Sequence, residues 1–486
     1  MWAQASGLCI AMRILMAASE GVPFSKTGGL ADVVGALPQA VARLGHEVAV
    51  VLPRYRMTRL DSSRSVLRSL TIPLGATLHF PEVLEGPAQD GVRTFFIDYP
   101  PYFDRDALYG TAAAGDYPDN AERFALFSRA VLEVGKHLFP AQVLHCHDWQ
   151  AGLVPVLLAH TYAQDPALRG VGTLFTIHNL GYQGLFPPEA LDRIGLGRDL
   201  FSIAHLEFYG KVNLLKGALV HADYINTVSK KYAAEIQTPE YGFGLEGVVG
   251  SRATVVSGVL NGVDYTEWNP ATDCHIAAHY TPEKLEGKRA CKKDLLAEFQ
   301  LPADNLDRPV IGIVSRFTVQ KGADLIAGAA DALAREDFYL VALGTGDAQY
   351  EELFRRLARE YPERIAVRIA YDNTLAHKIE AGADMFLMPS RYEPCGLNQI
   401  YSLKYGTVPV VRATGGLDDT IDEATGFKFQ DYAAEALLDT VRQALRAFQD
   451  RKGWRRLMLC GMARDLSWNA SAKEYAALYQ KIAEVG

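Results

Sequence analysis

The chain has 486 residues, of which 49% are hydrophobic and 22% are charged, as is usual for a soluble globular protein. This length exceeds that of one ordinary domain, so we expect two or three. The formal net charge of −8, from 49 basic and 57 acidic residues, argues against a nucleic-acid polyanion as partner.

The six cysteines form no Cys-x-x-Cys pair and no regular framework, which predicts reduced thiols and a cytoplasmic location. No apolar run reaches the ~18 residues of a membrane span, so no membrane association is expected. Residues 1–20 resemble a signal peptide only superficially, because Arg13 interrupts the apolar part and no basic region precedes it. Met12 is a candidate initiator, and the role of residues 1–11 stays open.

The first half of the chain alternates apolar runs with helical stripes. Residues 13–19 form a short apolar run that suits a strand buried on both faces. Leu30 to Leu44 carry an apolar stripe at helical spacing, in which Pro38 could introduce a kink. The further strands that we expect in this half cover residues 46–53, 142–148, 172–179 and 223–229.

The same alternation restarts after about residue 260. A strand at 308–317 precedes a helix at 323–336, and the later strands are expected at 338–346, 364–371, 384–390 and 408–416. Strands that alternate with helices predict parallel sheets covered by helices on both faces.

The fold class is therefore predicted as α/β with two Rossmann-like domains. We place the N-terminal domain at residues 1–256 and the C-terminal domain at 257–466. The Gly- and Asn-rich segment 257–270 is the candidate hinge. The helical segment 467–486 is expected to pack back on the N-terminal domain.

This fold class indicates where ligands bind. In open parallel sheets, ligands lie beyond the carboxyl ends of the strands, and a pocket between two domains is the natural site. Polar residues just after the predicted strands are therefore the candidates.

The first candidate is "PFSKTGGLADVVGALP", residues 23–38. Gly28 and Gly29 lie between a strand and a helix, where a bare backbone and the helix dipole favour an anion. Lys26 adds a full positive charge. The stretch suits a phosphate or sugar-oxyanion site, although a glycine turn beside a solvated lysine gives the same pattern.

The second candidate is "SRFTVQKG", in which Arg316 and Lys321 follow the first strand of the second series. Arginine offers a planar fork and lysine a compact charge, so together they can clamp a diphosphate. The alternative is a pair of solvated surface cations.

The third candidate is "SRYEPCGLNQIYSLKYG", residues 390–406. Glu393 could accept hydrogen bonds from sugar hydroxyls or stabilise a developing cation, or it could simply pair with Arg391. Gly396 and Leu397 are expected to begin a helix whose amides can hold an anion. Cys395 could be a nucleophile, but a cysteine without a base beside it more often only packs. Another glycine turn at a predicted strand end covers Thr414, Gly415 and Gly416.

Histidines follow two strands of the first series. His145 and His147 alternate on one strand, point the same way and could bind a metal ion, although no third ligand is evident. Asp148 ends this strand, and His178 ends the next one, in "TIHN".

Taken together, these motifs resemble those of the bacterial glycogen synthase and plant starch synthase family. "KTGGLADVVGALP", "HDWQ", "TIHN", "SRFTVQKG", "SRYEPCGLNQ" and "RATGGLDDT" occur in the family's order over about residues 20–420. The resemblance implies the GT-B architecture, two Rossmann-like domains facing each other across a cleft. It also implies transfer of glucose from ADP-glucose to the non-reducing 4-OH of an α-1,4-glucan such as glycogen, with retention of configuration.

The resemblance also implies roles for individual residues. It assigns Arg316 and Lys321 to the donor's diphosphate and Lys26 to the donor's phosphates and sugar. It places Glu393 and His178 beside the transferred glucose, and Asp148 matches an acidic residue of the family's cleft. The glycines and neighbouring residues that it assigns to substrate binding are Gly28, Gly29, Asn261, Tyr371, Cys395, Gly396, Leu397, Thr414, Gly415 and Gly416. Asn398 stands where many bacterial members carry threonine, which leaves donor preference and glucan length open.

We expect no metal ion and no cofactor in this reaction, because Arg316, Lys321 and glycine amides can neutralise the departing ADP. Retention could follow from double displacement through a carboxylate or from attack on the face that the leaving group vacates, and the resemblance favours the second route. The competing functions are a non-catalytic nucleotide-sugar or glucan sensor, and a related transferase or epimerase with another donor.

Overall fold

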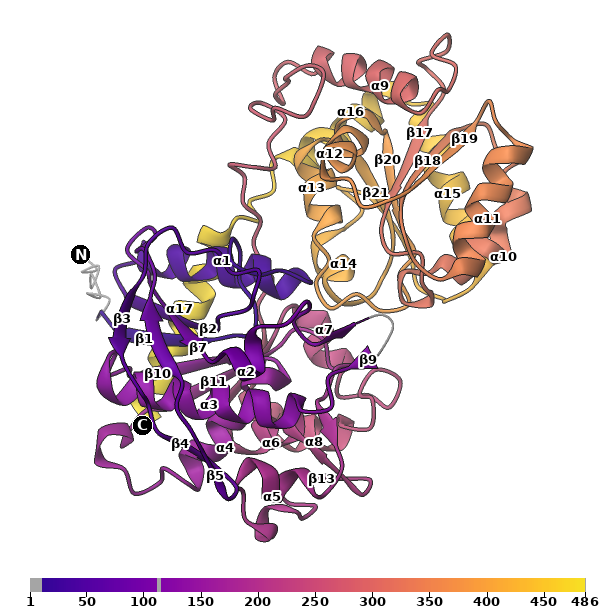
Figure 1. Ribbon diagram of the computed structural model, residues 1–486. Coiled ribbons are helices and arrows are strands. Elements are labelled where there is room, and N and C mark those ends of the chain that lie inside the picture. Colours follow the sequence, from indigo (N-terminus) through magenta and orange to yellow (C-terminus); the bar gives the residue numbers. More distant parts are fainter. Residues whose placement is uncertain (1–10, 112–114, 486) are drawn as a thin grey trace, which may run out of the picture. The chain divides into compact units, whose positions relative to one another are not determined.

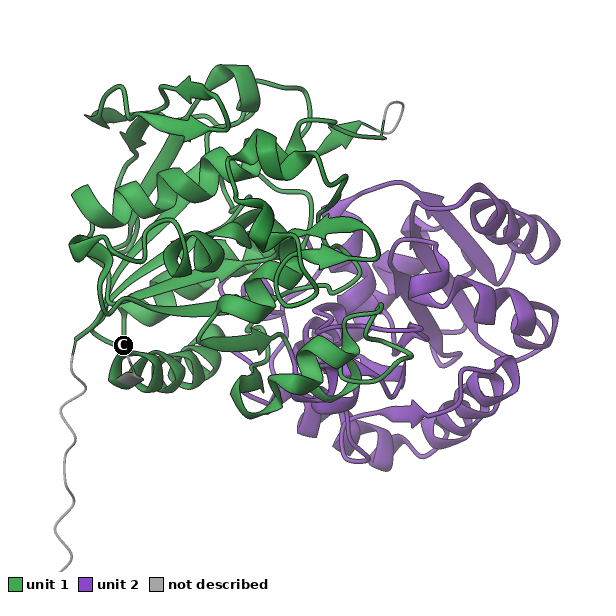
Figure 2. Ribbon diagram, turned by 90° about the horizontal axis from the view of Figure 1, so that it is seen from below, with its two compact units in different colours: residues 1–228, 233–262, 468–486 green, residues 229–232, 263–467 purple. Residues whose placement is uncertain are grey.

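The computed structural model describes residues 11–111 and 115–485. Residues 1–10, which belong to the N-terminal segment whose role the sequence leaves open, lie outside it. Its internal contacts divide the chain into two compact units (Figure 2). Unit 1 comprises residues 1–228, 233–262 and 468–486, and unit 2 comprises residues 229–232 and 263–467. The chain therefore passes from unit 1 to unit 2 after Gly262, within the predicted hinge.

Unit 1 is built on a nine-stranded sheet (Figure 1). The order of the strands across the sheet, compared with their order along the chain, indicates where a ligand can bind. The strands are β1 (Arg13–Ala17), β2 (Glu47–Pro53), β3 (Arg64–Leu67), β6 (Glu82–Glu85), β7 (Arg93–Asp98), β10 (Val143–His147), β11 (Gly172–Ile177), β15 (Tyr224–Thr227) and β16 (Val256–Gly258). Across the sheet they run β16-β15-β11-β10-β1-β2-β7-β6-β3, and only the pairs β7–β6 and β6–β3 are antiparallel.

The parallel part of this sheet has the strand order of a dinucleotide-binding fold. Counted along the chain, β7, β2, β1, β10, β11 and β15 stand in the order 3-2-1-4-5-6. The order reverses between β1 and β10, and ligands bind at this switch point, beyond the carboxyl ends of the two strands. Both strands are almost wholly buried, as expected for a parallel sheet covered on both faces.

Helices cover both faces of the sheet of unit 1. The main ones are α1 (Gly29–Ala42), α3 (Asn120–His137), α4 (Leu153–Ala159), α6 (Leu214–His221) and the last helix, α17 (Trp468–Val485). The apolar face of α1 buries Leu30, Val33, Val34 and Leu37 in a cluster that also contains residues of α17. Helix α1 continues through Pro38.

Helix α17 belongs to unit 1 although the chain reaches it only after unit 2. Tyr479 bonds to His145 of β10 at 2.8 Å, and the hydroxyl of Tyr475 accepts a hydrogen bond from Asn226 of β15 at 3.0 Å. Ile482 packs so closely against Gly172 of β11 that a side chain on that glycine would collide with it. The helix thus fills one face of the sheet and satisfies polar groups on it.

Unit 2 is built on a six-stranded parallel sheet in the order β19-β18-β17-β20-β21-β22. Its strands are β17 (Val310–Val314), β18 (Tyr339–Gly344), β19 (Ile365–Ile369), β20 (Met385–Met388), β21 (Val408–Arg412) and β22 (Phe427–Phe429). Along the chain this order is again 3-2-1-4-5-6, with the switch point between β17 and β20.

Helices also cover both faces of the sheet of unit 2. They include α9 (Glu286–Glu298), α10 (Ala323–Leu333), α11 (Ala348–Glu360), α12 (Asn373–Gly382), α13 (Asn398–Lys404), α14 (Gly415–Thr420), α15 (Ala434–Phe448) and α16 (Arg451–Met462). Two clusters of buried apolar residues pack on opposite faces of the strands. Among the described residues, no helix combines the length and the apolar character that a membrane crossing requires.

Each strand predicted in the two series is present, and all but β2, which ends at Pro53 as predicted, end earlier than predicted. The polar residues at the predicted strand ends therefore lie in the loops beyond the sheets. Sequence reading missed β7 in the parallel part of the first sheet, the edge strands β16 and β22, and the antiparallel strands β6 and β3. It also missed the hairpins of β4 (Ile72–Leu74) with β5 (Thr77–His79) and of β8 (Gly110–Thr111) with β9 (Gly115–Asp116), and the small sheet of β12 (Leu185–Phe186), β13 (Glu207–Phe208) and β14 (Lys211–Asn213).

Candidate functional site

In unit 1 the loop after β1 carries Lys26 and the two glycines at the start of α1. Gly28 is the N-cap residue of α1, and a side chain added at Gly29 would meet nothing within 4 Å. The Lys26 ammonium group lies 2.6 Å from Asp32 in the first turn of the helix, and its side chain is half exposed. The loop is therefore an open helix N-terminus with a cation beside it, as the sequence predicted.

Glu20, which sequence reading did not select, already supplies an anion to this loop. Its carboxylate accepts hydrogen bonds from the Thr27 amide and hydroxyl, and from the Gly28 amide. Burial raises the pKa of Glu20, and these hydrogen bonds oppose the rise. The loop amides thus have the geometry that holds a carboxylate oxygen. Glu20 follows the end of β1, so the rule that selected the other strand-end residues also applies to it.

Asp148 lies across the switch point, directly after β10, in a strained conformation. Its φ of 55° and ψ of 179° fall in a region that is essentially reserved for glycine. Its carboxylate accepts the His178 amide at 2.7 Å. Burial raises the pKa of Asp148 to about 7, and the nearby Glu20 charge adds to the rise. Strain of this kind clusters at functional sites, which supports the selection of Asp148.

His178 follows β11 and is held by a second histidine. Its Nε2 lies 3.0 Å from Nδ1 of His147, and burial lowers the pKa of His178 to about 3, so the ring is neutral at pH 7. The rings of His145 and His147 lie with their centroids 4.0 Å apart and their planes tilted by 38°. Both ring nitrogens of His145 bond to hydroxyl groups, those of Tyr479 and Thr176. The hypothesis that His145 and His147 bind a metal ion is therefore wrong for His145, whose nitrogens serve the fold.

The raised pKa of Asp148 predicts that its charge destabilises unit 1. An unfolded aspartate has a pKa near 3.8, so the penalty grows as the pH rises from about 4 and is complete above about 7. We expect Asp148→Asn, which keeps the backbone strain but removes the charge, to raise the free energy of unfolding at pH 8 by up to about 4 kcal/mol, since the rise from 3.8 to about 7 is roughly three pKa units at about 1.4 kcal/mol each. Denaturant unfolding at pH 8, 6 and 4 measures this. The gain should fade toward pH 4, and a gain independent of pH would contradict the assignment.

In unit 2 the switch point between β17 and β20 brings two predicted site residues into direct contact. Lys321 lies in the loop after β17, and its Nζ is 2.5 Å from a carboxylate oxygen of Glu393, in the loop after β20. Ser390 donates a hydrogen bond to the same oxygen at 3.0 Å. Only 7% of the Glu393 side chain is exposed, so this carboxylate depends on the two partners.

Arg316 and Arg391 flank this pair differently. Arg316 is exposed and donates to the side chain of Gln320 at 3.1 Å, so its guanidinium can reach a ligand at the strand ends. The alternative pairing of Glu393 with Arg391 is wrong, because Glu393 pairs with Lys321. The Arg391 guanidinium instead lies over the ring of Tyr432 at 5.3 Å.

The glycine turn after β21 supports the loop that carries Glu393. Gly415 has a φ of 45°, and a Cβ there would lie 1.8 Å from the Glu393 carbonyl oxygen. A Cβ at Gly416 would lie 2.0 Å from the Cys395 carbonyl oxygen, and its amide donates to the Glu393 carbonyl at 3.1 Å. Thr414 is also buried. The two glycines thus allow the close approach that fixes the backbone on either side of Pro394.

The residues after Glu393 lead into α13. Cys395 is buried, as the packing alternative required, and Gly396 has a φ of 71°. Leu397 is the N-cap residue of α13. Asn398, which departs from the bacterial pattern, donates from its side chain to the Val314 carbonyl at 2.7 Å and so ties α13 to the end of β17.

The two remaining candidates lie in different units. Asn261 belongs to unit 1, where its side-chain oxygen is buried and has no hydrogen-bond partner among the described residues. Tyr371 belongs to unit 2, follows β19 and is 86% exposed. An unpaired buried oxygen and an exposed aromatic ring are both available to a ligand.

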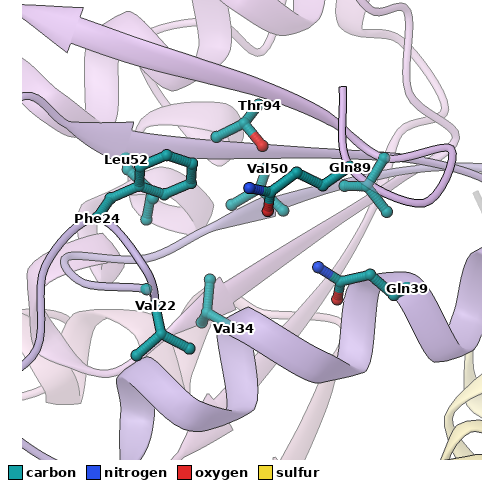
Figure 3. Close-up of a pocket in the computed structure, with 10 residues that line it drawn as sticks. Val22, Phe24, Val34, Gln39, Val50, Leu52, Gln89 and Thr94 are labelled. Atoms are coloured by element: carbon teal, nitrogen blue, oxygen red, sulfur yellow. The ribbon is translucent and has the colours of Figure 1, made fainter. Parts of the chain in front are cut away.

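Two other features near β1 and β2 are structural. A cavity of about 10 Å³ beneath the loop after β1, lined by Val22, Phe24, Val34 and Gln39 among others, has room for one water molecule but not for a sugar (Figure 3).

The carboxylates of Asp104 and Asp106 form an Asp-x-Asp pair, a pattern that can hold a metal ion. Here both of them form ion pairs with Arg56.

Known proteins resemble both halves of this chain. Residues 13–251 match the family model of the starch synthase catalytic domain, and residues 297–456 match that of glycosyl transferases group 1. A glycogen synthase of Koribacter versatilis is 60% identical over 98% of this chain and 99% of its own length. One of Anaeromyxobacter dehalogenans is 49% identical over 97% of this chain and all of its own length.

Solved structures agree with these relatives. The catalytic domain of starch synthase IV from Arabidopsis thaliana, bound to ADP and acarbose, is 30% identical, with a TM-score of 0.86 over 98% of this chain and 100% of that chain. Sucrose-phosphate synthase from Thermosynechococcus elongatus, 19% identical with a TM-score of 0.60 over 97% of this chain and 99% of its own, shares the fold.

Two Rossmann-like units with polar residues gathered at each switch point, together with these matches, define a glycosyltransferase of the GT-B fold class, and the predicted fold class is confirmed. The chain belongs to the glycogen synthase and starch synthase family.

Proposed function

We propose that the enzyme transfers glucose from ADP-glucose to the non-reducing 4-OH of an α-1,4-glucan, with retention of configuration, and thereby elongates glycogen. The observation that carries the proposal is the contact between Lys321 and Glu393. It joins a cation and a carboxylate from two loops at the switch point of unit 2. A nucleotide sugar presents both a diphosphate and a sugar carbon that becomes electron-poor during transfer, so it needs both charges.

In this proposal unit 2 binds the donor. Lys321 and Arg316 neutralise the diphosphate, and Glu393 stabilises the positive charge that develops on the sugar. The turn of Gly415 and Gly416 holds Glu393 in place, and Tyr371 offers an aromatic face to the nucleotide. The starch synthase IV structure that matches this chain contains ADP, which supports a nucleoside diphosphate as the product.

Unit 1 supplies groups that act on sugar hydroxyls and phosphate oxygens. Lys26 and the amides of Gly28 and Gly29 attract anionic oxygens, and Asp148 and neutral His178 exchange hydrogen bonds with sugar hydroxyls. Asn261 has a buried oxygen that still lacks a donor. The acarbose in the starch synthase IV structure supports an oligosaccharide as the other substrate.

The reaction that we propose breaks the bond between C1 of glucose and the diphosphate oxygen. The acceptor O4 forms its bond to C1 on the face that the diphosphate leaves, and the acceptor proton moves to the departing phosphate oxygen. Glu393 therefore forms no covalent bond. The chain's own cations carry the charge of the departing ADP, so the proposal includes no metal ion or cofactor. We also place the enzyme in the cytoplasm, in keeping with the five free cysteines among the described residues.

The proposal predicts rapid release of ADP when the protein is mixed with ADP-glucose and glycogen. Without glycogen the rate of ADP release should fall close to zero, because no acceptor 4-OH is then present to form a bond to C1 of glucose. The matched reaction with UDP-glucose measures the donor preference. Digestion of the product with an enzyme specific for α-1,4 links should return the transferred glucose. Binding of both substrates without release of ADP would favour the non-catalytic sensor, and release only with UDP-glucose would favour a related transferase.

A further inference from the structure

Three histidines of unit 1 lie close together outside the candidate site. His160 directly follows α4, His205 lies in the loop after the short helix η3 (Arg198–Leu200), and His221 is the last residue of α6. Helix α4 begins just after Asp148 and the short helix η1 (Trp149–Ala151), and its seven residues span about 10 Å. The histidine cluster therefore lies at the end of α4 away from Asp148.

The ring nitrogens of these histidines are already near metal-binding distances. One nitrogen from each ring lies within 4.8 Å of the other two. Nδ1 of His205 and Nε2 of His221 are 3.1 Å apart. Tetrahedral zinc with bonds of about 2.0–2.1 Å holds its ligands roughly 3.3 Å apart. The spacing of these two nitrogens thus already matches zinc ligands, and the rings must turn so that their lone pairs converge on one ion.

The three side chains are also of the type that binds transition-metal ions, since each imidazole offers a ring nitrogen as a ligand. Within the cluster, only His205 and His221 share a hydrogen bond. A bound cation could instead accept a lone pair from each of the three rings. Zinc, nickel and copper ions favour such nitrogen ligands, and magnesium does not.

The surroundings hold the ligands and leave an entry path. Arg252 donates to the carbonyls of Val220 and Ala222, both at 2.6 Å, and so fixes the end of α6 where His221 lies. Its positive charge weakens the binding of any cation, which predicts moderate affinity. The exposed side chain of His160 leaves the cluster open to solvent, so an ion can reach it from that side.

We propose that His160, His205 and His221 bind one divalent transition-metal ion, with zinc as the best fit, and leave its fourth position to water. The bound ion would join the ends of α4 and α6 to the loop between η3 and β13. It takes no part in the transfer, so this proposal does not depend on the proposed function.

The test uses the full chain without a polyhistidine tag, stripped of metal ions by EDTA and then dialysed. Isothermal titration with zinc chloride should give one site per chain, and cobalt chloride should develop the visible absorption of tetrahedral Co²⁺. Zinc should raise the temperature of unfolding. Replacing a residue that only hydrogen-bonds to a metal ligand lowers the affinity for the metal by ~10–100-fold. Replacing a ligand itself should cost at least as much, so we expect at least this loss of zinc affinity in His160→Ala, His205→Ala and His221→Ala.

His160→Ala is the decisive variant, because His160 is exposed and its removal leaves the core intact. His137→Ala is the matched control, since His137 is also an exposed histidine, at the end of α3, but pairs with Glu133. The control should bind zinc as the unchanged protein does, and magnesium chloride should give no heat. Failure of the stripped protein to bind zinc, or equal binding by His160→Ala and His137→Ala, would overturn the proposal. ADP release by the zinc-free protein tests the proposed function separately.

Discussion

Replacing Lys321 by alanine should lower the turnover by ~10²–10³, because removal of one electrostatic group that stabilises the transition state typically costs that much. Lys321 is in direct contact with Glu393, so its loss removes a cation from the diphosphate and leaves a buried carboxylate without its main partner. Arg316→Ala should fall in the same range, because Arg316 is the second cation after β17. Initial rates of ADP release with ADP-glucose and glycogen measure both effects.

Lys293→Ala is the control for these variants, since Lys293 is an exposed lysine of α9 in the same unit. Each variant should unfold cooperatively in a thermal scan, which separates a lost charge from a lost fold. EDTA should leave the rate of the unchanged protein unaltered. If Lys321→Ala or Arg316→Ala kept a rate near that of the unchanged protein, that residue would not neutralise the diphosphate. If EDTA abolished ADP release and magnesium restored it, a metal ion would carry the charge of the leaving ADP instead.

Glu393→Gln should separate chemistry from binding. The substitution keeps the size of the side chain but removes its negative charge, so turnover should fall by ~10²–10³ through weaker stabilisation of the sugar cation. Lys321 then loses its internal partner and is free to bind the diphosphate, so the affinity for ADP should stay equal or increase. Steady-state rates and titration with ADP measure the two quantities.

A different result would identify a different role for Glu393. If the affinity for ADP fell as steeply as the turnover, Glu393 would act mainly by shaping the loop. If intact-mass spectrometry of the unchanged enzyme with ADP-glucose revealed a glucosyl adduct, retention would proceed by double displacement. Ser390→Ala is a useful companion, because it removes the weaker hydrogen bond to the same oxygen.

The sequence predicted most strands of the two parallel sheets because such strands are buried on both faces and read as unbroken apolar runs. It missed three of them: β16 and β22 have only three residues each, and β7 begins with Arg93 and ends with Asp98, so none reads as a clear apolar run. It also predicted which loops carry polar groups, since strand ends point to the site in this fold. It did not predict the antiparallel strands β6 and β3 at one end of the first sheet, whose residues are mostly half-buried. Short segments that mix polar and apolar residues in this way resemble loops.

Contacts inside the site were less predictable than its location. The pairing of Glu393 with Lys321 joins residues from two loops, whereas Arg391 was the nearer candidate in the chain. Glu20 was overlooked because nothing local marks a carboxylate whose partners are amides of its own loop. The strain at Asp148 likewise depends on backbone angles that the letters "HDW" do not encode.

The position of α17 has a consequence for how the protein is made. Unit 1 is begun first on the ribosome, but the helix that covers its sheet is synthesised only after the whole of unit 2. Until Tyr475 and Tyr479 arrive, Asn226 and His145 lack their partners and a broad apolar surface stays exposed. Domains usually mature in the order of their synthesis. Here the second unit can mature before the first, and a nascent chain that stops before α17 would be a substrate for chaperones and proteases.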